Sequence, residues 1–262
     1  MDLQVLVSTM HQQDYSIIEK MNIQSDAIIV NQCDRNEIEE FTYKGNKIKF
    51  ISLNERGVGL SRNTALMRAT AEICLFADDD MFYVDGYKEI VLEEFRKNPN
   101  ADLIFFNVPS TNINRPTYII TKNKRVRWYN SMRFGAVNIA IRTDRVREEN
   151  IYFSLLFGGG AKYSSGEDSL FIADCIRKGL RAYSNTKIIG YVNQEVSSWF
   201  KGYTDKFFID KGVFYAHLSK KWAKFFCLRY VLKHKDKFLS EKSWKEALDL
   251  MLKGVEEHNR RK

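Results

Sequence analysis

The feature that most constrains this chain is an apolar stretch, residues 73–77, that runs directly into three carboxylates, Asp78, Asp79 and Asp80. The length and composition of the stretch predict a buried strand, and the carboxylates mark the end at which it reaches solvent. Three adjacent carboxylates repel one another unless a cation lies among them. Oxygen ligands of this kind suit Mg²⁺ or Mn²⁺, which proteins hold through one or two carboxylates with water and phosphate oxygens. The alternative is a solvated acidic turn without a ligand.

Strands and helices are predicted to alternate around this stretch. Short apolar segments predict further strands at residues 3–9, 26–30, 47–53 and 101–108. Apolar side chains at helical spacing predict helices at residues 15–21, 60–71 and 168–178. Because most of the strands are apolar on both faces, we expect an α/β fold with a single, mainly parallel central sheet and flanking helices. Ligands of such sheets bind beyond the carboxyl ends of the strands, where Thr9, residues 31–34 and the Asp cluster would meet.

Composition narrows the class of protein. The 262 residues are enough for one large domain or for one domain with a small appendage. The formal net charge of +8 suits a phosphorylated or polyanionic partner, or an anionic membrane surface. The 4 cysteines are scattered singly, which is typical of reduced core residues. The chain has neither the apolar core of a signal peptide near its start nor an apolar run of roughly 18 residues, so we expect a cytoplasmic protein.

A second acidic pair, Glu167 and Asp168, begins the helix predicted at residues 168–178. Carboxylates at a helix N-terminus are stabilised by the free N–H groups and by the helix dipole, so both residues are accounted for as simple caps. A carboxylate at this position would also stay ionised, as a catalytic base must be.

Taken together, these motifs resemble the family 2 glycosyltransferases, over roughly residues 3–180. The residues that carry the resemblance are, in chain order, Thr9, Asn54, Gly59, Arg62-Asn63, Phe76 to Asp80, Phe134-Gly135 and Gly166 to Asp168. The resemblance implies the nucleotide-sugar-binding GT-A fold, which is Rossmann-like, with a DXD metal motif and Mn²⁺ or Mg²⁺ as cofactor. It also implies inverting transfer of a sugar from a nucleoside diphosphate donor, expected to be a UDP-sugar, to a hydroxyl of a glycan or lipid-linked acceptor. The expected setting is the assembly of bacterial surface polysaccharide.

The resemblance also implies roles for individual residues. Thr9 and the turn that contains Gln32 and Asp34 would face the nucleobase, and Arg62 would approach the base or the diphosphate. The acidic residues would act as ribose or metal ligand (Asp78), main metal ligand (Asp80), and general base (Asp168, with Glu167 beside it). The chain departs from the family at two places, since Asn31-Gln32 stand where acidic residues are common and Asp79 stands where a small polar residue is frequent.

The composition changes after about residue 195, so we expect a catalytic domain at residues 1–195 and a closing loop with packed helices at residues 196–262. In the closing segment, Trp199 and Tyr203 would frame the sugar or acceptor and Lys211 would contact the diphosphate. The alternative is that the large aromatic side chains here only pack the segment onto the core.

Two C-terminal helices are predicted at residues 220–235 and 243–258, with Ser243 and Glu246 spaced as a capping box. Both helices combine basic and aromatic side chains, which suits peripheral binding to the inner, anionic face of the plasma membrane. Helices docked on the catalytic domain would show a similar pattern.

Two other functions remain open at this stage. A nucleotidyltransferase acting on sugar phosphates would share the sheet and the metal carboxylates, but it would need a glycine-rich phosphate loop that residues 8–13 lack. A basic nucleic-acid-binding module would fit the net charge, but the basic residues are spread along the chain and no nucleic-acid-binding motif is present.

Overall fold

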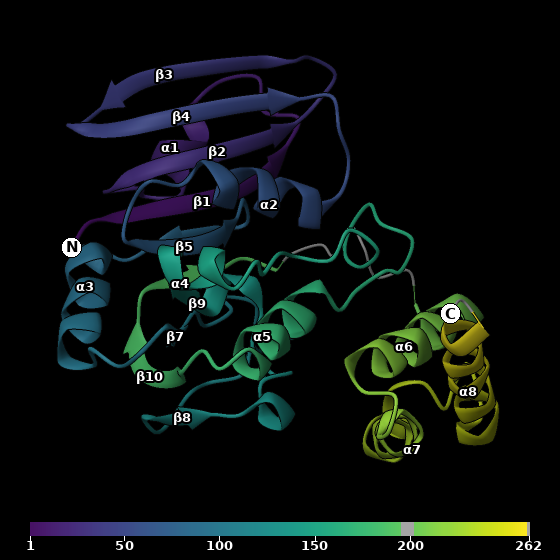
Figure 1. The fold of residues 1–262 in the computed structure, drawn as a ribbon. Coiled ribbons are helices and arrows are strands. Elements are labelled where there is room, and N and C mark those ends of the chain that lie inside the picture. Colours follow the sequence, from purple (N-terminus) through teal and green to yellow (C-terminus); the bar gives the residue numbers. More distant parts are fainter. Residues whose placement is uncertain (195–201, 261–262) are drawn as a thin grey trace. The chain divides into compact units, whose positions relative to one another are not determined.

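The computed structural model describes residues 1–194 and 202–260. The chain packs into two compact units (Figure 1). The first comprises Met1–Ser154 and Asp168–Val196, and the second comprises Leu155–Glu167 and Ser197–Lys262. The boundary expected between residues 195 and 196 stays a prediction.

Within the described residues, nine strands of the first unit form one mixed sheet in the order β3-β4-β2-β1-β5-β9-β7-β10-β8 (Figure 1). The strands are β1 (Leu3–Met10), β2 (Asp26–Gln32), β3 (Glu37–Tyr43), β4 (Asn46–Leu53), β5 (Ile73–Asp78), β7 (Leu103–Asn107), β8 (Lys124–Val126), β9 (Ile139–Arg142) and β10 (Ala182–Ile188). Strand β1 pairs in parallel with β2 and β5, β2 with β4, and β10 with β7. Strands β3, β8 and β9 run antiparallel to their neighbours. The expected mainly parallel α/β sheet is confirmed.

Helices cover both faces of this sheet. They are α1 (Ser16–Lys20), α2 (Val58–Arg68), α3 (Tyr87–Lys97), α4 (Thr143–Glu148) and α5 (Glu167–Arg177), with short 3-10 turns at Trp128–Asn130 and Ala136–Asn138. Successive side chains of a strand point to opposite faces, so Val5 and Val7 join a core with α1 and α3, and Leu6 joins a second core with α2, α4 and α5. This arrangement explains why the strands are apolar on both faces, and it brings the polar strand ends to one edge.

A small two-stranded sheet follows the Asp cluster. It pairs β6 (Met81–Tyr83) with β11 (Gly190–Val192) in antiparallel register. The Asn193 N–H, just past β11, donates a hydrogen bond to the carbonyl oxygen of Asp80 (2.7 Å). The turn that carries the carboxylates is therefore fixed on both sides, by β5 before it and by this small sheet after it.

The second unit contains the helices α6 (Asp205–Leu218), α7 (Ala223–His234) and α8 (Trp244–Arg260), with a 3-10 turn at Lys235–Lys237. The expected C-terminal helical extension is confirmed, and so is the capping box, because Ser243 and Glu246 each accept the other's backbone N–H. Helices α6 and α8 touch through glycines: a Cβ on Gly212 would lie 1.9 Å from the Met251 oxygen, and a Cβ on Gly254 would lie 2.1 Å from the Ile209 oxygen.

The segment Leu155–Glu167 packs within this second unit. The Ser164 N–H donates to Asp210 Oδ2 (3.0 Å), and Gly166 lies directly against the ring of Phe214. Among the described residues, no helix has both the length and the apolar character needed to span a bilayer.

Candidate functional site

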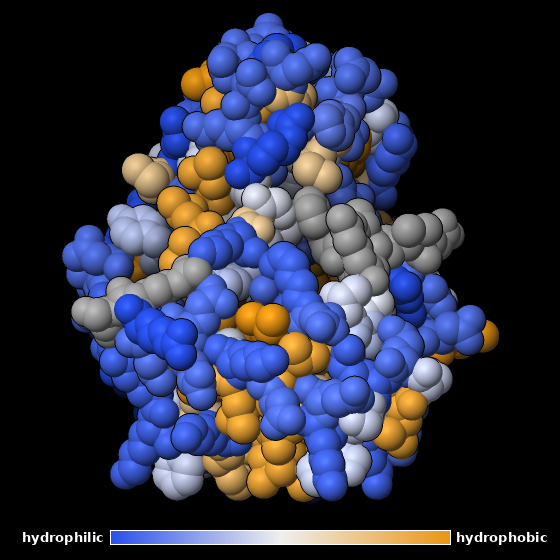
Figure 2. Space-filling view, turned by 90° about the vertical axis from the view of Figure 1, so that its right-hand side faces the viewer, coloured by the Kyte–Doolittle hydropathy of each residue, from blue (hydrophilic) through white to orange (hydrophobic). Residues whose placement is uncertain are grey.

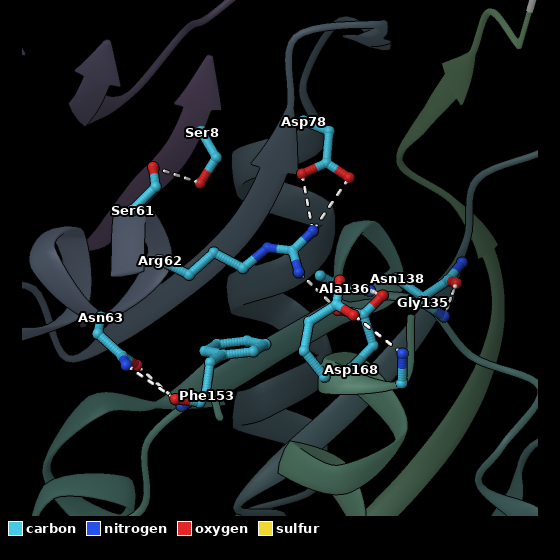
Figure 3. A network of polar contacts seen from close by, with 12 residues as sticks. Ser8, Ser61, Arg62, Asn63, Asp78, Gly135, Ala136, Asn138, Phe153 and Asp168 are labelled. Atoms are coloured by element: carbon cyan, nitrogen blue, oxygen red, sulfur yellow. Dashed lines mark hydrogen bonds and ion pairs between the residues drawn. The ribbon is translucent and has the colours of Figure 1, made fainter. Parts of the chain in front are cut away.

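A buried arginine, Arg62 of α2, binds two carboxylates that come from separate parts of the chain (Figure 3). Its Nη2 donates to Asp78 Oδ1 (2.8 Å) and Oδ2 (3.2 Å), and its Nη1 donates to Asp168 Oδ1 (2.6 Å). The arginine side chain is 3% exposed, whereas those of Asp78 and Asp168 are 37% and 25% exposed. Hydrogen bonds between ionised partners are short and directional, so Arg62 fixes both carboxylates while leaving each partly open to solvent.

Neighbours of Arg62 anchor α2 to other elements. The Ser61 hydroxyl donates to Ser8 Oγ of β1 (2.9 Å). The Asn63 amide exchanges two hydrogen bonds with the backbone of Phe153 (2.9 and 2.8 Å). The Phe153 ring in turn lies under the guanidinium, with 5.3 Å between Arg62 Cζ and the ring centroid (Figure 3). The residues on either side of Arg62 therefore anchor its helical turn, and the Phe153 ring supports its guanidinium.

A close approach also fixes the start of α2. A Cβ on Gly59 would lie 2.6 Å from the Ser154 carbonyl oxygen, so a larger residue at this position would push the backbone away. Glycine is therefore the residue that allows α2 to reach the segment that carries Phe153.

Asp168 is held by a second contact as well. Its Oδ2 accepts a hydrogen bond from the backbone N–H of Ala136 (3.0 Å), and Gly135 lies beside the same oxygen. The Gly135 N–H donates to Asn138 Oδ1 (3.0 Å), and Asn138 Nδ2 donates to the Phe106 carbonyl at the end of β7 (2.9 Å). The Phe134-Gly135 motif thus lies next to the acidic helix start. Glu167 Oε2 accepts a hydrogen bond from the Gly166 N–H (3.0 Å).

The three consecutive carboxylates have different surroundings. Asp78 binds Arg62, and Asp79 Oδ2 accepts from the hydroxyl of Thr9 at the end of β1 (2.6 Å). Within the described residues, the Asp80 carboxylate forms no ion pair and no hydrogen bond with another residue, and its own backbone N–H is its donor. Partial burial, followed by the charges of Asp78 and Asp79, raises the pKa of Asp80 to about 6. A cation would relieve this repulsion, so Asp80 is the carboxylate best suited to bind one.

Few side chains at this site are available as metal ligands. Within residues 1–194 and 202–260, no three His, Cys, Asp or Glu side chains are arranged as a metal cage. One carboxylate from Asp80, with Asp78 nearby, fits a Mg²⁺ or Mn²⁺ ion whose remaining ligands are water and phosphate oxygens. The residues present therefore fit a metal that arrives with a phosphorylated substrate.

The residues expected to face the nucleobase lie at the ends of β1 and β2. The Gln32 side chain is buried and exchanges two hydrogen bonds with the backbone of Gly57, which has a φ of +130° (3.0 and 3.2 Å). Asp34 is exposed in the following turn. Gln12 Nε2 donates to Thr9 Oγ1 (2.9 Å), so Thr9 links the β1 end to the Asp cluster. Contacts of Thr9, Gln32 and Asp34 with a nucleobase remain predictions.

In the second unit, Lys211 lies among aromatic rings. Its Nζ lies 5.5 to 5.7 Å from the ring centroids of Phe207, Phe214 and Tyr230. Burial lowers the pKa of Lys211, and the charges of Glu167 and Asp210 oppose that shift.

Tyr203 packs against aromatic rings of the same unit, at 5.3 Å from Phe207 and 5.6 Å from Phe238. Trp199 lies outside the described residues. The contacts proposed for Trp199, Tyr203 and Lys211 with donor or acceptor remain predictions.

Comparison with known proteins gives two results. The sequence model described as "Glycosyl transferase family 2" matches residues 15–151, just over half of the chain. A search of curated proteins gave no match.

The fold is similar to solved structures of S. aureus TarS residues 1–349. The complex with UDP-GlcNAc has a TM-score of 0.69 and 17% identity, covering 97% of this chain and 82% of that one. The complex with UDP has a TM-score of 0.66 and 17% identity, covering 97% and 81%. The structure whose title names no ligand has a TM-score of 0.63 and 14% identity, covering 100% and 92%.

Proposed function

The chain belongs to glycosyl transferase family 2, and from that premise we propose that it moves a sugar from a nucleoside diphosphate donor to an acceptor hydroxyl. A UDP-sugar is the donor that we expect, since similar folds have been solved with UDP-GlcNAc and with UDP. The expected acceptor is a glycan or a lipid-linked sugar in the assembly of surface polysaccharide. The observation that carries the proposal is the Arg62 bridge, which joins a carboxylate beside the DXD turn to a carboxylate at the start of α5.

The donor would lie at the carboxyl edge of the sheet, next to Thr9 and the Asp cluster. Asp80, with Asp78 nearby, would hold a divalent cation, Mn²⁺ or Mg²⁺, bound together with the diphosphate. A bound cation of this kind stabilises the negative charge of a leaving diphosphate as a Lewis acid. The protein adds fixed positions, because Arg62 holds Asp78 and Asp168 in place before the reaction and their orientation then costs no reorganisation.

Asp168 would act as the general base. The acceptor oxygen attacks the anomeric carbon, its proton passes to an oxygen of Asp168, and the bond from the anomeric carbon to the diphosphate oxygen breaks. One displacement of this kind inverts the configuration of the anomeric carbon and requires no enzyme nucleophile. The hydrogen bonds from Arg62 and from the Ala136 N–H fix the orientation of the Asp168 carboxylate. Glu167 remains a second carboxylate at the same helix start.

Two features disfavour the other functions. A nucleotidyltransferase needs a glycine-rich phosphate loop after the first strand, and residues 8–13 contain no glycine. A nucleic-acid-binding module gives no reason for a buried arginine to hold two carboxylates. We also propose that the enzyme works at the cytoplasmic face of a membrane, because lipid-linked acceptors are presented there.

A panel of nucleotide sugars tests the proposed reaction. Thermal unfolding of the full chain with Mn²⁺ should show a rise in Tm with at least one uridine diphosphate sugar, and chelation of the metal should remove the rise. A rise with a nucleoside triphosphate and a sugar phosphate, but with no nucleotide sugar, would instead support the nucleotidyltransferase.

A further inference from the structure

Helix α7 has two apolar sides, of which only one is covered by other residues that the structure describes. Its covered side consists of Ala223, Phe226, Cys227 and Val231. On the other side, Phe225, Leu228 and Leu232 are 53%, 41% and 54% exposed. Their spacing of three and four residues places them in one line along the helix. Trp222 extends the line, since it is 47% exposed and its ring lies 5.9 Å from that of Phe225.

The exposed side is a shallow groove rimmed by positive charge. The groove has a volume of about 460 Å³ and is lined by Phe225, Leu228, Arg229, Leu232 and Lys233. Figure 2 shows one face of the molecule, on which orange hydrophobic surface is set among blue hydrophilic surface. The exposed side of α7 therefore presents apolar side chains that a partner surface could bury, with cations at their edge.

Nearly all charged residues around the exposed side of α7 are basic. Residues 220–237 contain seven lysines and arginines and one acidic residue, Asp236. Lys221, Lys224, Arg229 and Lys233 are all exposed. The positive potential also acts on His234, whose pKa is lowered by burial and then by Lys233, Lys237, Lys211 and Arg229.

We propose that this exposed face of α7, with Trp222, Phe225, Leu228 and Leu232 at its centre, docks on the surface of an anionic lipid bilayer. Bulky apolar side chains flanked by lysine and arginine are the composition that binds at the headgroup boundary, where cations meet acidic lipids. A second copy of the chain is a poorer occupant, because pairing two such faces would bring the same cations together. The inference rests on the membrane placement proposed above and is independent of sugar transfer.

Vesicle sedimentation of the full chain tests whether the exposed apolar side chains of α7 contribute to membrane binding. The protein should bind vesicles of phosphatidylcholine with phosphatidylglycerol and should bind pure phosphatidylcholine far less. Phe225→Ser/Leu232→Ser should weaken this binding by about tenfold or more. The matched control is Ile38→Ser/Met67→Ser, which removes two apolar side chains of the first unit that are at least as exposed, and it should leave binding unchanged.

Charge reversal in the same assay tests whether the cations beside these apolar side chains contribute to membrane binding. Arg229→Glu/Lys233→Glu should abolish binding at low salt, whereas Lys20→Glu/Lys47→Glu, an equal change of net charge elsewhere, should reduce it only slightly. Trp222 fluorescence should shift to shorter wavelength with anionic vesicles, and Trp222→Phe should remove that shift.

Three results would overturn the proposal. They are no binding to anionic vesicles at low salt, equal effects of the α7 and control variants, and an oligomer that Phe225→Ser/Leu232→Ser dissociates without any vesicle binding. Nucleotide-sugar binding by the α7 variants should equal that of the wild type, so failure of the membrane inference and failure of the proposed reaction are distinguishable.

Discussion

Asp78 and Asp168 are hydrogen bonded to the same guanidinium, although Asp78 ends β5 and Asp168 lies in the first turn of α5. Arg62 thereby links the turn that would hold the donor to the carboxylate that would activate the acceptor. Because the Arg62 side chain is almost fully buried, we expect the bridge to affect the stability of the fold as well as the reaction.

Replacement of Arg62 by methionine should reduce both stability and activity. Without the guanidinium, Asp78 and Asp168 would lose the positive charge between them, and both are partly solvated, so we expect a loss of about 1–3 kcal/mol in the free energy of unfolding. Urea unfolding measures this loss. The control is Arg68→Met, since Arg68 is exposed on the same helix and should change stability little. Equal stability of the two variants would contradict a bridge that holds the site together.

Replacement of Asp80 by alanine should remove the metal-dependent part of donor binding. The wild-type chain should gain about 2–4 kcal/mol of stability from saturating nucleotide sugar with Mn²⁺. The Asp80→Ala chain should gain little from the same mixture, and Asp236→Ala should behave as the wild type. Undiminished, metal-dependent stabilisation of the Asp80→Ala chain would show that the cation binds elsewhere.

The contact between α6 and α8 should tolerate no side chain at its glycines. Gly212→Ala and Gly254→Ala would each place a Cβ against backbone of the other helix, so each should cost about 1–3 kcal/mol or more of stability. Thermal unfolding, with the exposed Lys253→Ala as control, measures the effect. If a variant at either glycine has the same Tm as the wild type, the two helices can move apart at this point with little loss of stability.

The stability contribution of Lys211 should depend on pH. Burial lowers its pKa in the folded chain below the ordinary value of 10.5, so the unfolded chain binds the proton more tightly. Between the lowered pKa and 10.5, the wild type should therefore gain stability relative to Lys211→Met as the pH rises. Below that interval the difference should be constant. Urea unfolding of both chains from pH 7 to pH 10 checks the slope, and a difference that falls as the pH rises would contradict the effect of burial.

The central strands could be predicted because β1, β2, β4 and β5 are apolar on both faces. Strand β3 could not, since it pairs only at the sheet edge and its side chains are mostly exposed or half-buried. Helix α6 could not be predicted for the opposite reason. Its own buried residues are distributed around the helix, so its sequence shows no helical period of apolar and polar positions.

For the site, the sequence pointed to Arg62, Asp78 and Asp168 as separate residues. It gave no signal for their contact. Phe153, which lies under the guanidinium, comes from a segment without a recognisable pattern, and the Phe134-Gly135 motif does not by itself indicate that the next residue, Ala136, donates to Asp168. Burial and backbone donors of this kind are properties of the folded chain and are not encoded in local spacing.

The most direct test of the proposed reaction is the Asp168→Asn chain, assayed for donor binding and for release of UDP from a UDP-sugar with water as acceptor. Asparagine keeps the size and, through its one oxygen, can keep the bond from Arg62, but it loses the bond from the Ala136 N–H and cannot take a proton. We predict donor affinity within about threefold of wild type and a rate of UDP release lower by about 100-fold or more, with a smaller loss for Glu167→Gln. An Asp168→Asn chain that releases UDP at the wild-type rate would contradict the role of Asp168 as the base.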